Sequence, residues 1–297
     1  MGVPTRHILS QGPGLRAMGE GALVALKQRF GHGSDRALVT PGPELSDVLR
    51  PLPKKLVSDY VRHVGGDPSA WRGRLPPHLF PQWGFGLAAR TLSDVPYPLL
   101  KVLNGGCRLE INAPLPADQA LHVTARLEDV DDNGRRAVLH QRVVTGTAAE
   151  PEALVAHLYA IVPLASKGDG GAKKREKPRV PDHVRELSFF RIGERAGLEF
   201  AKLTGDFNPV HWVPGYARAM GFRNVILHGF STMARAFEGV ARGQHAGRVD
   251  AIRTFDVRFS RPLILPARVG LYVDEGRGVW VGDAPGGPAY LTGSFGG

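Results

Sequence analysis

Three short segments of this chain recur in the same order in its second half. Tyr60–Pro68 resembles Phe200–Pro209, Trp83-Gly84-Phe85 resembles His228-Gly229-Phe230, and Pro114-Leu115 resembles Pro262-Leu263. Because the spacing between the segments is nearly kept, we interpret the chain as two copies of one structural unit. Each copy then has to bury the same kind of helix against the same kind of sheet, which restricts the fold to a duplicated α+β architecture.

In each half, apolar segments separated by turn residues follow one helix-like segment. They predict strands over 102–112, 121–130, 136–145 and 154–162, and again over 252–259, 267–273, 278–282 and 289–295. The intervening stretch 166–182 has almost no apolar residues and is predicted to be a flexible linker. We therefore divide the chain into an N-terminal extension (1–44), a first unit (45–165), the linker (166–182) and a second unit (183–297). Within the extension, 15–30 is a candidate helix interrupted by glycine.

Composition limits the classes of protein that remain. The chain of 297 residues has a formal net charge of +10, but the basic residues do not form one patch: a group of them lies in the linker and the others are spread among apolar segments with no aromatic interleaving, so we expect no nucleic-acid partner. No run of apolar residues is long enough for a membrane span, and the first residues lack the apolar core of a secretion signal, so we expect a cytoplasmic protein. The single cysteine, Cys107, excludes an internal disulfide and is predicted to be a buried strand thiol.

The polar side chains that best suit a catalytic site lie on one short turn of the second copy. Asp206, Asn208 and His211 occur within six residues, and Gly205 and Pro209 break any regular helix through them. The first copy has no counterpart of Asn208 or His211, and Trp83 replaces His228. We therefore expect the chemistry to come from the second half and a wall for the substrate to come from the first. The wall candidates are Phe80, Trp83 and Phe85, which are equally consistent with an ordinary helix core.

The pattern Gly205-Asp206-x-Asn208-Pro209-x-His211, followed by Gly221-Phe222 and His228-Gly229-Phe230, resembles the signature of the MaoC-like dehydratases, also called R-specific enoyl-CoA hydratases or hydratase 2. The resemblance implies the hot-dog fold, in which a long helix is wrapped by a curved antiparallel sheet. With the duplication, it implies the double hot-dog form. Phe230 departs from the family, which often has Met there, and the segment before Leu45 lies outside the resemblance.

The resemblance also implies an activity, namely reversible hydration of 2-enoyl thioesters and dehydration of (R)-3-hydroxyacyl thioesters. It implies catalytic roles for Asp206 and His211, with Asn208 assisting. An acid and an imidazole that hold one water suit this chemistry, because water must lose a proton while C2 gains one. The backbone N–H of Gly229, at a helix start, is the expected donor to the thioester carbonyl. His228 is expected either to contact substrate or to bond a buried carbonyl.

Several alternatives remain open from the sequence. Asp206 and Asn208 are also suited to cap the following helix, and Asp206, His211 and His228 together could form a metal triad, although we expect no metal and no cofactor. A hot-dog thioesterase or a non-catalytic acyl-thioester-binding module would use the same fold. The expected partner is an acyl-CoA or an acyl-carrier-protein thioester, with positive charge suiting both. The chain is expected to be a monomeric pseudo-dimer or a homodimer.

Overall fold

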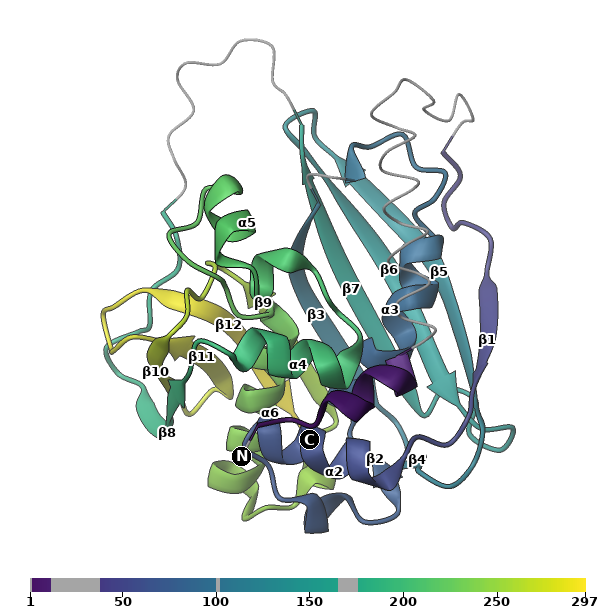
Figure 1. Cartoon of the computed structure of the whole chain (residues 1–297), viewed down its shortest axis with the longest axis horizontal. Coiled ribbons are helices and arrows are strands. Elements are labelled where there is room, and N and C mark those ends of the chain that lie inside the picture. The colour runs from purple at the N-terminus through teal and green to yellow at the C-terminus, as the bar shows by residue number, and fades with distance from the viewer. Residues whose placement is uncertain (1, 12–37, 100–101, 165–175) are drawn as a thin grey trace.

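The protein is built around one ten-stranded antiparallel sheet, with helices packed against it (Figure 1). The structure, a computed structural model, describes residues 2–11, 38–99, 102–164 and 176–297. The strands of this sheet are β1 (Leu45–Leu49), β3 (Leu103–Ile111), β5 (Leu121–Asp132), β6 (Arg136–Gly146), β7 (Leu154–Pro163), β8 (Arg185–Ile192), β9 (Thr254–Phe259), β10 (Ala267–Val273), β11 (Gly278–Gly282) and β12 (Ala289–Gly296). A separate small sheet pairs β2 (Arg74–Leu75) with β4 (Leu115–Pro116).

The helices form two sets that match the two halves of the sheet. In the first half, α3 packs on β5 and β6, and in the second half α6 packs on β8, β9, β11 and β12. The α-helices are α2 (Lys54–His63), α3 (Pro81–Arg90), α4 (Ala196–Thr204), α5 (Pro214–Ala219) and α6 (Gly229–His245). The 3-10 helices are η1 (Thr5–Gln11), η2 (Pro68–Trp71), η3 (Pro77–Leu79), η5 (Pro209–His211) and η6 (Val249–Ala251).

The order of the strands shows the duplication directly. The sheet runs β1-β5-β6-β7-β3 and then β9-β12-β11-β10-β8, so each strand of the first half has a counterpart at the mirrored place in the second. The halves join where β3 pairs with β9, from Gly106 opposite Arg258 to Glu110 opposite Thr254. Gly106 is required at this junction, because a Cβ there would lie 2.4 Å from the Val257 carbonyl oxygen. The two halves therefore form one continuous sheet.

Helix packing between the halves fills the centre of the molecule. Phe230, near the start of α6, makes edge-to-face contacts with Phe80 and Phe85 of the first half and with Phe259 of β9. A buried carboxylate of α6, Glu238, accepts hydrogen bonds from Trp71 Nε1 at 2.7 Å and from His78 Nε2 at 3.1 Å. Apolar packing and satisfied polar contacts both cross the junction, so neither half presents a complete core without the other.

The structure confirms all of the predicted strands, with small differences at their ends. To the main sheet it adds two strands that sequence reasoning missed, β1 and β8, which lie at its two outer edges, and the small sheet of β2 and β4 was also missed. The side chains of β1 and β8 are mostly exposed or half-buried, so neither strand forms the kind of apolar segment on which the prediction depended. The two principal helices also differ in length, because α3 has 10 residues and α6 has 17. At the C-terminal end of α3, the Gln141 side-chain amide donates hydrogen bonds to the Ala88 carbonyl and to Thr91 Oγ1.

The segments outside the two units are only partly described. The candidate helix over 15–30 and the first part of the predicted linker lie outside the described residues. The last part of the linker belongs to the second half: Arg179 forms a bridge with Pro288, and Val180 is buried against Tyr272 and Ala289. The division at 45–165 and 183–297 stays our prediction. No helix in the described part of the chain is long and apolar enough to cross a membrane.

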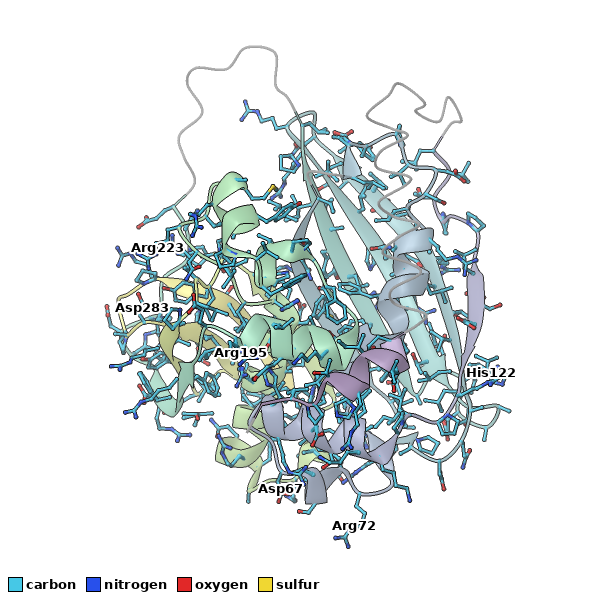
Figure 2. All side chains as sticks on the ribbon, viewed as in Figure 1. Asp67, Arg72, His122, Arg195, Arg223 and Asp283 are labelled. Atoms are coloured by element: carbon cyan, nitrogen blue, oxygen red, sulfur yellow. The ribbon has the colours of Figure 1, made fainter. Side chains whose placement is uncertain are left out.

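The surface charge is distributed rather than concentrated. Figure 2 shows Arg72, Arg195 and Arg223 at separate places on the surface, and Asp283 lies near Arg223. Many arginines are paired locally with carboxylates, as Arg126 is with Glu128 at 2.7 Å. A positive charge arranged in this way attracts anions weakly from many directions.

Candidate active site

The polar turn of the second half begins where α4 ends. Gly205 terminates the helix with φ of 82°, a left-handed conformation that suits glycine. Asp206 Oδ1 accepts a hydrogen bond from the Asn208 backbone N–H at 3.3 Å, and Asn208 Oδ1 accepts one from the Val210 N–H at 3.2 Å. Each of the two side chains thus stabilises the backbone turn that follows it. Asn208 is the N-cap of η5, which is the capping role that the sequence offered as an alternative to a catalytic one.

Both imidazoles of the motif are held by backbone carbonyls. His211 Nδ1 bonds to the Ile226 carbonyl at 2.8 Å, which leaves Nε2 with a lone pair. His228 Nε2 bonds to the Asp206 backbone carbonyl at 3.0 Å and lies 3.8 Å from the Asp206 carboxylate oxygen Oδ2. The rings stack with centroids 3.6 Å apart. His228 therefore bonds a carbonyl at the helix start, one of its two expected roles, and aligns the turn that carries Asp206.

Burial keeps both rings neutral. It lowers the pKa of His211 below the ordinary value of 6.5, against the opposing effects of Asp206 and the Ile226 carbonyl. Burial, together with neighbouring His211, lowers the pKa of His228 to about 3. A neutral His211 whose Nδ1–H is already bonded can accept a proton at Nε2 at neutral pH. The site therefore has a carboxyl group and a proton-accepting imidazole side by side.

The same three side chains have potential metal-ligand atoms within 4.8 Å of one another. The two rings, however, are stacked with an angle of only 25° between their planes. Imidazole binds a metal through lone pairs in the plane of its ring, and those of two stacked rings run side by side instead of converging. The arrangement of Asp206, His211 and His228 suits proton transfer better than metal chelation.

Helix α6 points its N-terminus at the site. Gly229 is its first residue, so its N–H has no acceptor within the helix and lies at the positive end of the helix dipole. A Cβ at Gly229 would lie 2.9 Å from the ring of Phe259. The glycine is therefore required by close packing against Phe259.

An apolar cavity leads away from the turn into the first half. Its volume is about 280 Å³, and it lies between α3 and strands β3, β6 and β7. Thr204, Gly205 and Asp206 form part of its lining, so one part of it borders the polar turn. The other lining residues are contributed mainly by the first half and include Phe85, Leu92, Val102, Leu103, Leu158 and Ala160.

Of the three predicted wall residues, the structure places one along this cavity. Phe85 lines it, whereas Phe80 is fully buried against Phe230 and Trp83 donates its Nε1–H to Thr145 Oγ1 at 3.0 Å. Trp83 lies inside α3 because Pro81 begins that helix, while His228 precedes α6, so the two are not structural equivalents. Sequence reasoning missed Leu158 and Ala160, whose place on a predicted strand was the available signal.

A further glycine that sequence reasoning missed sets the place of the turn. Gly197, in the first turn of α4, packs so closely that a Cβ there would lie 2.0 Å from the His211 carbonyl oxygen. The turn carrying His211 can therefore lie directly on α4 only because residue 197 has no side chain. Its only signal in the sequence was a glycine inside a helix-like segment.

Acid is expected to destabilise this protein through two buried histidines. Burial and nearby Arg235 lower the pKa of His63 to about 3, as burial does for His228. Because the unfolded state takes up these protons near pH 6.5 and the folded state does not, stability is complete above that pH and is lost as the pH falls. Each histidine should lower the free energy of unfolding by about 1.4 kcal/mol per pH unit. Urea unfolding at several pH values measures this slope.

The control for this prediction is His63→Leu, which removes one of the two groups. The difference in free energy of unfolding between this variant and the unmodified protein should change with pH by the contribution of one histidine. Other acidic groups cancel in that difference because they are common to both proteins. A difference that stays constant between about pH 6.5 and pH 4 would contradict the prediction.

Two half-sheets joined edge to edge, each covered by one principal helix, define the double hot-dog class. Residues 174–279 match the family model of the MaoC-like domain. The resemblance inferred from Asp206, Asn208 and His211 is thereby confirmed.

Relatives and solved structures extend the similarity over most of the chain. The chain is similar to 3-hydroxyacyl-thioester dehydratase X of Mycobacterium tuberculosis (29% identity, covering 63% of this chain and 64% of the relative) and to dehydratase Y of the same organism (30% identity, covering 60% and 62%). The match thus spans somewhat less than two thirds of each relative. HtdX of M. tuberculosis has a TM-score of 0.65 at 22% identity, covering 85% of this chain and 99% of that one. A MaoC-like dehydratase from Phytophthora capsici has a TM-score of 0.66 at 17% identity, covering 89% and 97%. These structures confirm the fold.

Proposed function

We propose that this chain is a hydro-lyase that adds water reversibly to 2-enoyl thioesters and dehydrates 3-hydroxyacyl thioesters. The observation that carries the proposal is the pairing of Asp206 with a neutral, proton-accepting His211 beside an apolar cavity. The names of the two mycobacterial relatives support the same reaction class. The family resemblance supports the R configuration at C3.

In hydration, one water molecule bound between Asp206 and His211 attacks C3 of the enoyl group. As the C3–O bond forms and the double bond breaks, the pair takes one proton from the water and returns one to C2, so it ends with the protons it had at the start. The reverse sequence expels water from the 3-hydroxyacyl thioester. His211 Nε2 is the proton-accepting atom because its Nδ1–H is bonded to the Ile226 carbonyl.

The negative charge that develops on the thioester oxygen needs a fixed donor. The Gly229 N–H at the start of α6 supplies it, and such a donor typically contributes roughly 10²–10³ in rate. Asn208 assists by holding the turn through its cap, and His228 assists by orienting the Asp206 backbone. The acyl chain then extends into the cavity of the first half, past Phe85.

The test is a hydration assay with a series of enoyl-CoA and enoyl-acyl-carrier-protein thioesters, following the loss of enoyl absorbance. Loss of absorbance without release of free thiol is the expected result. Release of free thiol would instead identify a thioesterase, and binding without any loss of absorbance would identify a non-catalytic module. The same series decides between the two carriers. We keep the cytoplasm as the proposed location, although some relatives have peroxisomal names.

The cavity predicts that filling it with a larger side chain should weaken the binding of long acyl chains more than that of short ones. Its volume of about 280 Å³ would hold roughly nine groups the size of a methylene, taking about 30 Å³ for each as for a water molecule. Ala160→Phe adds a ring to its lining on β7. We expect KM for a long enoyl thioester to rise at least about tenfold, the effect of losing roughly 1.4 kcal/mol of apolar contact. Crotonyl thioester, whose acyl group of four carbons is too short to fill the cavity, is the internal control and should change less than about twofold.

A further inference from the structure

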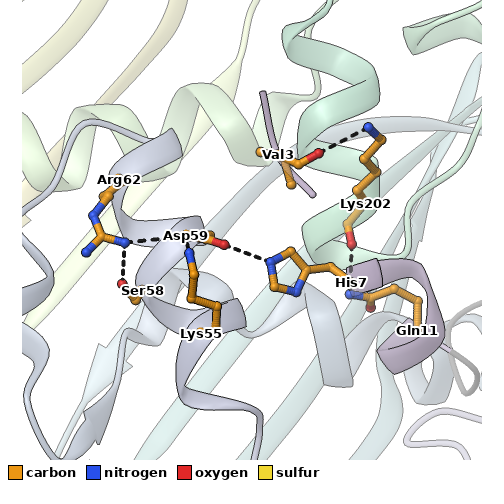
Figure 3. Close-up of polar contacts among 8 residues, drawn as sticks. All are labelled: Val3, His7, Gln11, Lys55, Ser58, Asp59, Arg62 and Lys202. Carbon is orange, nitrogen blue, oxygen red and sulfur yellow. Dashed lines mark hydrogen bonds and ion pairs between the residues drawn. The ribbon is translucent and has the colours of Figure 1, made fainter. Parts of the chain in front are cut away.

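The first residues of the chain lie across helices from both halves (Figure 3). Two side chains of η1 are almost fully buried, His7 at 4% exposure and Gln11 at 1%. His7 Nε2 pairs with Asp59 of α2 at 2.8 Å, and Asp59 also binds Lys55 and Arg62 of the same helix. This end of the segment is therefore anchored to the first half.

Gln11 binds the other half at the helix that leads into the active-site turn. Its Nε2 donates to the Lys202 carbonyl of α4 at 3.1 Å, and its Oε1 accepts from Gln82 Nε2 of α3 at 3.2 Å. Lys202 makes a second contact with the N-terminal segment, since its Nζ donates to the Val3 carbonyl at 3.2 Å. One amide thus connects the last turn of α4 with the helix that covers the acyl cavity.

The hydrogen bond from Gln11 reaches α4 at its C-terminal end, just before the turn that carries Asp206. The last carbonyls of a helix lack intrahelical donors and need partners from elsewhere. The final backbone bond of α4 runs from the Gly205 N–H to the Ala201 carbonyl, and the next carbonyl, that of Lys202, receives the Gln11 amide. Asp206 follows four residues after Lys202. Gln11 therefore caps the end of α4 immediately before the left-handed turn that aims Asp206.

We propose that Gln11 is a positioning residue for the active site: it fixes the end of α4 and, through it, the Asp206 carboxylate relative to His211. This proposal rests on the proposed hydratase function for its kinetic effect but not for its structural effect. Small displacements of a reacting group cost up to roughly 10²-fold in rate, so a loosened helix end should reduce turnover without changing the acyl cavity.

Gln11→Met tests the proposal, because methionine keeps the length of the side chain and lacks the amide. His7→Leu is the matched control, since it removes a buried polar contact of the same segment to α2 and leaves the Gln11 bond in place. We expect both variants to lower Tm. Only Gln11→Met should lower kcat, by about tenfold with KM within about twofold. Only Gln11→Met should speed backbone hydrogen exchange in residues 203–211.

Two results would overturn the proposal. Equal losses of kcat in both variants would show that the segment only stabilises the fold, and unchanged exchange over 203–211 in Gln11→Met would show that Gln11 does not hold the turn. The exchange measurement does not depend on turnover. If the unmodified protein hydrates no enoyl thioester, the proposed function fails, and the exchange result still decides whether Gln11 positions Asp206.

Discussion

Asp206→Asn is expected to lower kcat for enoyl-thioester hydration by roughly 10²–10⁴, the contribution of one positioned acid or base. The substitution keeps the size of the side chain and an oxygen that can accept the Asn208 N–H, so the turn and the His228 bond to the Asp206 carbonyl should persist. What it removes is the proton-carrying carboxyl group. The measurement is steady-state hydration of crotonyl thioester, with unfolding curves to show that the fold is retained.

The duplicated chain offers a matched control at the corresponding place of the first half. Asp67 follows Gly66 and precedes Pro68, but its carboxylate accepts bonds from the Ser69 N–H and hydroxyl at the start of η2. Asp67→Asn should therefore leave kcat within about twofold, because capping contributes to stability and not to proton transfer. An Asp206→Asn enzyme as active as Asp67→Asn would remove the carboxylate from the proposed mechanism.

His211→Asn is expected to lower kcat by roughly 10²–10³ for a separate reason. The asparagine amide can replace the Nδ1–H that bonds the Ile226 carbonyl, so the position of the side chain is kept while the Nε2 acceptor is lost. Because burial lowers the pKa of His211 below the ordinary histidine value, the ring stays neutral at neutral pH, and the activity of the unmodified enzyme should decline only at a pH more acidic than that ordinary value. The pH profile of kcat/KM for both proteins is the measurement.

His122→Asn is the control for this second prediction. His122 is an exposed histidine at the edge of the first half, far from α4 and α5 in Figure 2. Its replacement should leave both kcat and the pH profile unchanged. Two results would contradict the prediction that His211 is the titrating base. One is a His211→Asn variant that keeps its activity. The other is a weakly active His211→Asn variant whose activity still declines at the same acidic pH as that of the unmodified enzyme.

Features that depend on residues close together in the sequence were predicted correctly, whereas features that depend on distant residues were not. Eight strands of the main sheet were predictable because each is an apolar segment bounded by turn residues, and the turn at Asp206 was predictable because Gly205 and Pro209 interrupt helix locally. The assignment of Trp83 as the counterpart of His228 was wrong. A matching Gly-Phe pair located the two helices, but only the place of Pro81 decided where α3 begins.

The sequence by itself determined the duplicated architecture and the second half as the place of the polar turn, and it named Asp206 and His211 as the pair that we propose to be reactive. Only the tertiary structure decided which carbonyl fixes the tautomer of His211, that the two imidazoles stack, and that Gln11 caps α4 from 191 positions away. The physical reason is that local backbone conformation is encoded in neighbouring residues. A hydrogen bond or a cavity between distant segments depends on how whole helices and strands pack, which leaves no periodic trace in the sequence.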